Sequence, residues 1–195
     1  MNAIETQPQP IAQKPSGGMR YVDYCALPAE LRCELISGEL AMTPSPSTKH
    51  QRIAGELFYQ IKRYLDDHPA GVLFFAPMDV VLSPHDVVQP DLLLVLNENR
   101  GLIEENAIAG APDLVAEVLS AGTLERDVIH KTGLYERYGV KEFWRVDPQL
   151  ERIERLNRPG GKLEVTATFT KNERLESLLL PELTIGLDAV FASVS

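Results

Sequence analysis

The sequence predicts one domain of the α/β (α+β) class, in which strands and helices share a core. Segments 48–66 and 124–138 carry apolar residues at helical spacing. Strand-like segments precede and follow the second of these helices, which is typical of a crossover between strands of one sheet. Segments 33–42 and 151–169 each have two alternating stretches around a turn, as β-hairpins do.

Length and composition indicate the number of domains and the cellular location. A chain of 195 residues that is 44% hydrophobic has room for one substantial core, and we assign it to residues 21–195. Residues 1–20, rich in Pro, Gln and Gly, predict a disordered leader. Cys25 and Cys33 lack metal-ligand spacing and are expected as free thiols. No apolar run is long enough to span a bilayer, so we expect a soluble, cytoplasmic protein.

The net charge of −9 argues against a general nucleic-acid binder, because binding phosphates requires clustered Lys and Arg. The charge is uneven along the chain, however. Acidic residues dominate segment 84–117, whereas the segment from Arg126 to Arg158 is mixed and contains many basic residues. An acidic site beside a locally basic flank is compatible with this distribution.

The N-terminal part predicts a short helix start at 27–31 and a hairpin over 33–42 that turns at Ser37-Gly38. We expect its two acidic side chains, Glu34 and Glu39, to point to solvent, as most acids do.

The helix predicted at 48–66 begins at Thr48 as a cap. Its apolar stripe consists of Ile53, Leu57, Ile61 and Tyr64. His50 lies about two turns before Leu57 and so falls on the inward face. Spacing favours a hydrogen-bonded core histidine somewhat over a role in a site.

Strands are then predicted at 72–75, at 78–82 and over Val87–Leu96, where Asp91 follows Pro90. A polar connection over 97–109 is expected to include a short helix at 102–106. The next strand, 112–120, carries Glu117 among apolar neighbours. An ionised carboxylate in a buried strand is costly unless a cation or a donor meets it.

Asp91 and Glu117 are expected on neighbouring strands. Two carboxylates brought together repel each other unless a divalent metal lies between them. Hard oxygen donors favour Mg²⁺ or Mn²⁺, with the backbone carbonyl of Val118 as a further ligand, and no Cys or His cluster indicates zinc.

The helix predicted at 124–138 has an inward stripe that one charged residue, Lys131, interrupts. Its other members are Leu124, Val128, Tyr135 and Tyr138. Lys131 either covers apolar surface with its methylenes or meets the carboxylates of the sheet, and we favour the second interpretation. Its ammonium would position water or offset charge at a phosphate.

A buried strand at 140–148, an edge hairpin over 151–169, and a last strand-like segment with a short helix complete the predicted domain. The sequence has no internal repeat, no Gly-rich phosphate loop and no Gly-x-Ser-x-Gly elbow.

Several motifs together resemble the Uma-two restriction endonuclease family of the PD-(D/E)XK nuclease superfamily. They are Val-Val-Gln-Pro-Asp-Leu-Leu at 87–93, Gly-Ala-Pro-Asp-Leu-Val-Ala-Glu-Val-Leu-Ser at 110–120, Lys131 with Tyr135, and Tyr-Gly-Val-Lys-Glu-Phe-Trp-Arg-Val-Asp-Pro at 138–148. Glu-Leu-Ile-Ser-Gly-Glu-Leu at 34–40, Ser-Pro-Ser at 45–47 and His50 also resemble it. The similarity runs from about Tyr21 to the C-terminus.

This resemblance implies a restriction-endonuclease-like mixed β-sheet flanked by helices, a divalent-metal site and hydrolysis of DNA. Asp91 matches the Asp of the superfamily's Pro-Asp, and Glu117 matches the acid of its (Asp/Glu)-x-Lys. Leu119 stands where that motif has Lys, so the resemblance assigns the lysine's role to Lys131. His50 and Asp127 are secondary candidates.

The leading hypothesis is therefore a Mg²⁺-dependent (or Mn²⁺-dependent) endonuclease that acts on DNA as a homodimer, because two symmetric sites cut both strands most simply. A catalytically silent interaction protein with the same fold is an alternative that the net charge favours. A metal-dependent phosphoesterase with a small substrate is another.

Overall fold

A mixed six-stranded sheet lies at the centre of the computed structural model, which describes residues 17–28, 30–120 and 126–192, with the side chains of 126–129 excluded. The strand order is β10-β9-β8-β7-β6-β3, and only the pair β7–β8 is parallel. The bounds are β3 Gly71–Phe75, β6 Leu92–Leu96, β7 Leu114–Val118, β8 Glu142–Asp147, β9 Arg152–Asn157 and β10 Glu164–Thr170. The predicted mixed sheet and its edge hairpin, β9–β10, are confirmed.

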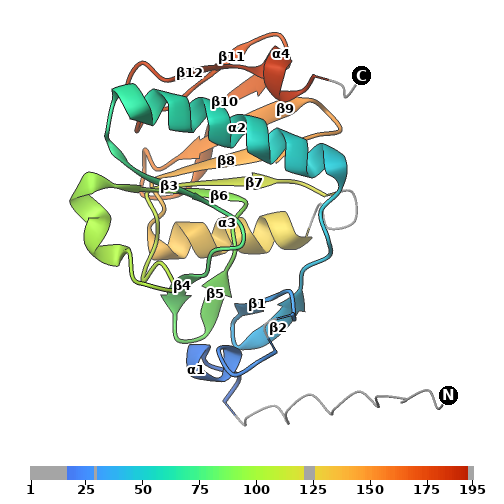
Figure 1. The fold of residues 1–195 in the computed structure, drawn as a ribbon, viewed down its shortest axis with the longest axis vertical. Coiled ribbons are helices and arrows are strands. Elements are labelled where there is room, and N and C mark those ends of the chain that lie inside the picture. Colours follow the sequence, from blue (N-terminus) through green and yellow to red (C-terminus); the bar gives the residue numbers. More distant parts are fainter. Residues whose placement is uncertain (1–16, 29, 121–125, 193–195) are drawn as a thin grey trace, which may run out of the picture.

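Two long helices, α2 (Thr48–Asp67) and α3 (Arg126–Tyr138), cover opposite faces of this sheet (Figure 1). The stripe of α2 packs on residues such as Leu92 and Trp144. Leu134 and Tyr135 of α3 pack on the other face with Val115. Because successive strand residues point to opposite faces, alternate positions of one strand serve the two cores.

The start and the stripe of α2 differ slightly from expectation. Ser47 is the N-cap, and its side chain accepts a hydrogen bond from the backbone N–H of His50, so the expected cap, Thr48, is the first helical residue. Leu65 is the fourth buried residue of the stripe. Tyr64 is partly buried and packs at the edge of this core, and its hydroxyl donates to the carbonyl of Pro181 at 2.6 Å.

A smaller sheet has the order β2-β1-β5-β4. Its strands are β1 Cys33–Ile36, β2 Glu39–Met42, β4 Val80–Ser83 and β5 Asp86–Val88. The predicted hairpin is confirmed: β1 and β2 pair through a turn at Ser37 and Gly38, both with positive φ. A Cβ on Gly38 would lie 3.1 Å from the Cα of Gly18, so this turn requires glycine.

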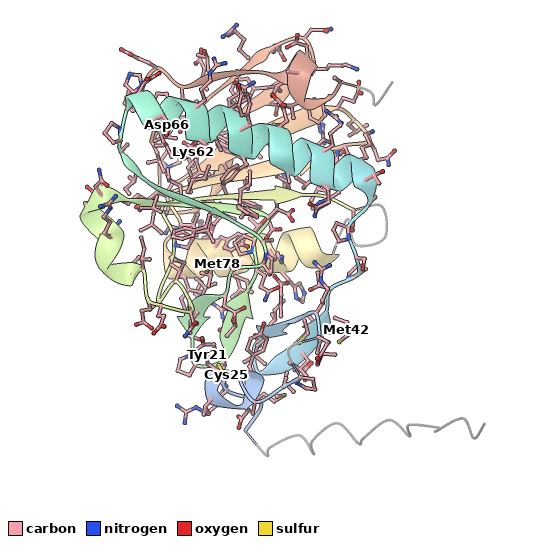
Figure 2. All side chains as sticks on the ribbon, in the orientation of Figure 1. Tyr21, Cys25, Met42, Lys62, Asp66 and Met78 are labelled. Carbon is pink, nitrogen blue, oxygen red and sulfur yellow. The ribbon has the colours of Figure 1, made fainter. Side chains whose placement is uncertain are left out.

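Residues before α1 contact this turn. Met19 N–H donates to the carbonyl of Gly38 at 2.9 Å, and helix α1 (Tyr21–Tyr24) follows. Residues 1–16 of the expected leader lie outside the described part of the chain. Cys25 is exposed beside Tyr21 (Figure 2), Cys33 is buried, and both are free thiols.

The connection after β6 forms a 3-10 helix, η1 (Asn97–Leu102), and the helix expected at 102–106 is absent. Buried Asp113 explains the position of this turn. Its carboxylate accepts from the backbone N–H of Leu96 at 2.7 Å and from the side-chain amide of Asn99 at 2.7 Å. These bonds fix the chain immediately after β6.

The C-terminal segment adds β11 (Arg174–Glu176), β12 (Thr184–Gly186) and α4 (Leu187–Val190), which lies against α2 (Figure 1). On the outer surface of α2, Lys62 and Asp66 form an ion pair (Figure 2). Among the residues that the structure describes, no helix combines the length and apolar character required to cross a membrane.

Candidate active site

The pairing of β6 with β7 places Asp91 and Glu117 together. These strands are antiparallel, with Leu92 opposite Ala116. The same register continued by one pair sets Asp91 opposite Glu117. Glu117 lies two residues beyond Val115 and therefore faces the side of the sheet that α3 covers.

Helix α3 supplies two polar side chains to Glu117. The ammonium of Lys131 lies 2.9 Å from Glu117 Oε1. The hydroxyl of Tyr135, one helical turn later, donates to the same oxygen at 2.6 Å. Residues four apart lie on one helix face, so both donors reach the same carboxylate. Lys131 thus interrupts the apolar stripe because it forms an ion pair with a carboxylate of the sheet.

Glu34 joins this cluster, and its expected exposure to solvent is wrong. Its side chain is only 8% exposed, and its Oε1 lies 2.9 Å from the ammonium of Lys131. The backbone N–H of Gln89 donates to the same oxygen at 2.8 Å. The missed signal is Ile36, which occupies the same face of β1 as Glu34 and shows that this face is not fully solvated.

Gln89, two residues before Asp91, is partly buried. Its side-chain amide donates to Asp79 Oδ1 at 2.8 Å, and the hydroxyl of Tyr24 lies 3.2 Å from the same atom. This network joins α1, the segment before β4 and the end of β5. It holds the backbone that leads through Pro90 to Asp91.

Two groups hold the carboxylate of Asp91. The backbone N–H of Val118 donates to Oδ2 at 2.8 Å, and His50 Nε2 lies 3.1 Å from the same oxygen. The other ring nitrogen of His50, Nδ1, is buried and has no hydrogen-bond partner among the described residues. His50 is therefore a core histidine that also touches a predicted site carboxylate. The side chain of the other secondary candidate, Asp127, lies outside the described residues.

The cluster carries more negative than positive charge, and the pKa values reflect this. Burial raises the pKa of Glu117 to about 7; Lys131 and Tyr135 oppose the rise, whereas Asp91 and Glu34 add to it. Burial would lower the pKa of Lys131, but Glu117 and Glu34 outweigh it and hold this pKa above its ordinary value. The ammonium is therefore charged at neutral pH, and Glu117 remains difficult to ionise.

The pKa values of His50 and Tyr135 are also raised. For His50, burial acts to lower the pKa, but the hydrogen bond and charge of Asp91 outweigh it, with support from Glu117 and Val118. For Tyr135, burial and then the charges of Glu117 and Glu34 raise the pKa well above its ordinary value. Tyr135 therefore stays a neutral hydrogen-bond donor.

The donor set fits a hard divalent cation. Glu34 and Glu117 both contact the one ammonium of Lys131, and the charge of Asp91 also acts on Glu117, whose pKa is raised first by burial and then by these neighbouring carboxylates. Carboxylate and carbonyl oxygens are the ligands that Mg²⁺ and Mn²⁺ prefer. Within the described part of the chain, no three His, Cys, Asp or Glu side chains are already arranged as a metal site. Binding would therefore rely on two carboxylates with backbone or solvent oxygens.

Comparison with known proteins identifies the family and the fold of the chain. The model of the Uma2 family, described as "putative restriction endonuclease", matches residues 20–189. A crystal structure of a putative nuclease belonging to DUF820 from Anabaena variabilis has the same fold, with a TM-score of 0.74 at 20% sequence identity. The match covers 89% of this chain and 98% of that one. No curated protein matches the sequence.

Proposed function

The chain belongs to the Uma2 family of putative restriction endonucleases, and from this premise we propose that it is a divalent-metal-dependent endonuclease that hydrolyses DNA phosphodiester bonds. The observation that carries the proposal is the ion pair between Lys131 and Glu117, on a strand whose register sets Glu117 opposite Asp91. Two acids and one amine in this arrangement supply the groups that phosphodiester hydrolysis with a metal requires.

Asp91 and Glu117, with the backbone carbonyl of Val118, would hold Mg²⁺ or Mn²⁺. Such an ion lowers the pKa of bound water and stabilises negative charge on a phosphoryl group. The roles of the protein residues follow from their contacts. Val118 N–H and His50 fix the orientation of Asp91, which makes His50 a positioning residue.

Lys131 is the proposed catalytic amine. Its raised pKa keeps the ammonium charged, so it can offset charge that develops on a phosphate or orient the attacking water. Glu34 holds Lys131 in place, and Tyr135 holds Glu117 in place. Asp127 remains a secondary candidate because it lies one helical turn before Lys131.

For the partners, we propose DNA as substrate and a homodimer as the active assembly, in the cytoplasm. Two copies related by two-fold symmetry would present two sites to the two strands of a duplex. The net charge of −9 means that phosphate contacts must come from local basic segments.

The test is incubation of the purified protein with supercoiled plasmid and Mg²⁺ or Mn²⁺, beside three single variants. Asp91→Ala, Glu117→Ala and Lys131→Ala should each lower the nicking rate by about 100-fold or more. Lys62→Ala is the matched control, because Lys62 is an exposed lysine of α2 that forms a surface pair with Asp66. It should nick like the wild type.

Two outcomes would redirect the assignment. If the wild type fails to nick DNA both with Mg²⁺ and with Mn²⁺, the protein is the catalytically silent interaction protein. A wild type that hydrolyses a chromogenic phosphodiester but not plasmid is a phosphoesterase with a small substrate.

A further inference from the structure

A pocket of about 290 Å³ opens beside Asp91, between α2 and the edge strand β3. Two aromatic side chains, Phe58 and Phe75, line it, together with Gln51, Gly55 and Asp91. We call it the aromatic pocket. It shares Asp91 with the proposed catalytic site. A ligand bound in the pocket would therefore lie next to the phosphodiester that this site hydrolyses.

The two aromatic rings are not fully covered by protein. Their centroids are 5.0 Å apart at an interplanar angle of 77°, so they meet edge to face and do not stack over each other. Phe75 is 60% exposed although it lies at the end of a strand of the main sheet, opposite Leu92. This arrangement leaves aromatic surface available beside Asp91.

Gly55 gives a second, independent indication of a ligand. It lies in the middle of the 20-residue helix α2, where glycine is the least favourable residue apart from proline. A Cβ at Gly55 would meet nothing within 4 Å, so packing inside the protein does not require glycine here. A larger side chain would instead take up space in the pocket that Gly55 lines.

We propose that the aromatic pocket binds an unpaired nucleobase adjacent to the scissile phosphate, so that each site acts on DNA that is locally unpaired where it is cut. This inference rests on the proposed function for the identity of the ligand. At about 290 Å³ the pocket is at the lower limit for small-molecule sites, which fits one ring system and not a duplex.

Charge favours the same ligand. Binding to duplex DNA depends on neutralising many phosphates, which a chain of net charge −9 does poorly. Stacking on an aromatic face needs no counter-charge and contributes substantially for any base. The amide of Gln51 adds a donor and an acceptor for the edge of the base.

The test measures binding by fluorescence anisotropy in a metal chelator, with a labelled 12-nucleotide single strand, the corresponding duplex and a fully abasic strand of the same length. Wild type should bind the single strand at least about tenfold more tightly than either competitor. Phe75→Ala and Gly55→Leu should weaken single-strand binding by about 5- to 100-fold and leave abasic-strand binding unchanged.

Two matched controls separate the pocket from general effects. Gly55→Ala adds only a methyl group and favours the helix, so it should bind like the wild type. Tyr59→Ala removes another exposed aromatic of α2 that does not line the pocket, and it should also bind like the wild type.

The proposal is overturned if the abasic strand or the duplex binds as tightly as the single strand, or if Phe75→Ala and Gly55→Leu bind normally. It is also overturned if these variants convert a dimer to a monomer in sedimentation, because the occupant would then be a second copy of the chain. The binding assay contains no metal and does not measure cleavage. Binding of the single strand by a protein that does not nick plasmid would therefore reject the nuclease assignment and leave the pocket proposal standing.

Discussion

The carboxylate of Glu34, on β1, and the ammonium of Lys131, on α3, form an ion pair with 2.9 Å between oxygen and nitrogen. The contact joins the small sheet to the helix that covers the large one. Because Lys131 also pairs with Glu117, the negative charge of Glu34 lies close enough to Glu117 to help raise its pKa to about 7.

Glu34→Gln should therefore lower the pKa of Glu117. The substitution removes one of the charges that oppose its ionisation and leaves Lys131 paired with it. The acid limb of the pH profile for plasmid nicking should move to lower pH. Glu39→Gln, which changes an exposed acid next to the turn of the same hairpin, should leave the limb in place. An acid limb that stays or moves to higher pH in Glu34→Gln would contradict the coupling.

Tyr135→Phe should have the opposite effect. It removes the hydroxyl that donates to Glu117 at 2.6 Å, a bond that stabilises the ionised carboxylate. The acid limb should move to higher pH, and the free energy of unfolding should fall by about 1.5–3 kcal/mol. Tyr138→Phe is the matched control, because its hydroxyl donates to a different carboxylate, Asp86, at 2.7 Å. Equal pH profiles for the two variants would argue against the role of Tyr135.

The parts of the fold that follow from periodicity could be read from the sequence. The stripe Ile53, Leu57 and Ile61 locates α2, and the alternation around Ser37-Gly38 locates the first hairpin. An acid in a buried strand and a lysine in an apolar stripe are costly alone, so each predicts a partner. The pairing of Glu117 with Lys131 follows from that reasoning.

Other features depend on how the two sheets pack, which no local pattern states. The sequence favours exposure of Glu34 because acids are usually exposed, and only its neighbour Ile36 indicates otherwise. The hydrogen bond from Tyr135 cannot be predicted from the apolar stripe, because tyrosine is treated there as an apolar residue. Gln89 supports Asp91 through Asp79, a residue from a separate segment, so its role depends on tertiary contacts.

Glu142 should be essential for stability although it is far from the proposed chemistry. This fully buried carboxylate accepts from Trp144 Nε1 at 2.7 Å, Asn157 Nδ2 at 2.9 Å and the backbone N–H of Leu178 at 2.9 Å. Glu142→Gln turns an N–H toward at least one of these donors and should cost about 2–3 kcal/mol in urea unfolding. Glu164→Gln, on the exposed face of β10, should change stability little. A loss below about 0.5 kcal/mol at Glu142 would contradict this account.

Metal binding should stabilise the protein more at high pH than at low pH. Mg²⁺ requires ionised ligands, and Glu117 is ionised only above a pKa of about 7. At 100 times its dissociation constant the ion should add about 2.7 kcal/mol, measured as a rise in Tm at pH 8 that is much smaller at pH 5.5. Asp91→Asn should reduce the rise at pH 8. An equal rise at both pH values, or one that Asp91→Asn leaves intact, would place the metal elsewhere.

Glu117→Gln should change how stability depends on pH in the absence of metal. The folded pKa of Glu117, about 7, lies above its ordinary value of 4.5, so the folded state retains a proton that the unfolded state has lost. The protonated group therefore favours folding fully below pH 4.5, and this contribution is lost as the pH rises to about 7. Gln mimics the protonated acid at every pH. The free energy of unfolding of the variant minus that of the wild type should thus rise by up to about 3 kcal/mol between pH 4.5 and pH 8 in urea titrations.

Glu164→Gln should give a flat difference over the same range, because its side chain is exposed in the folded state. A flat difference for Glu117→Gln as well would mean that the pKa of Glu117 is not raised in the folded state.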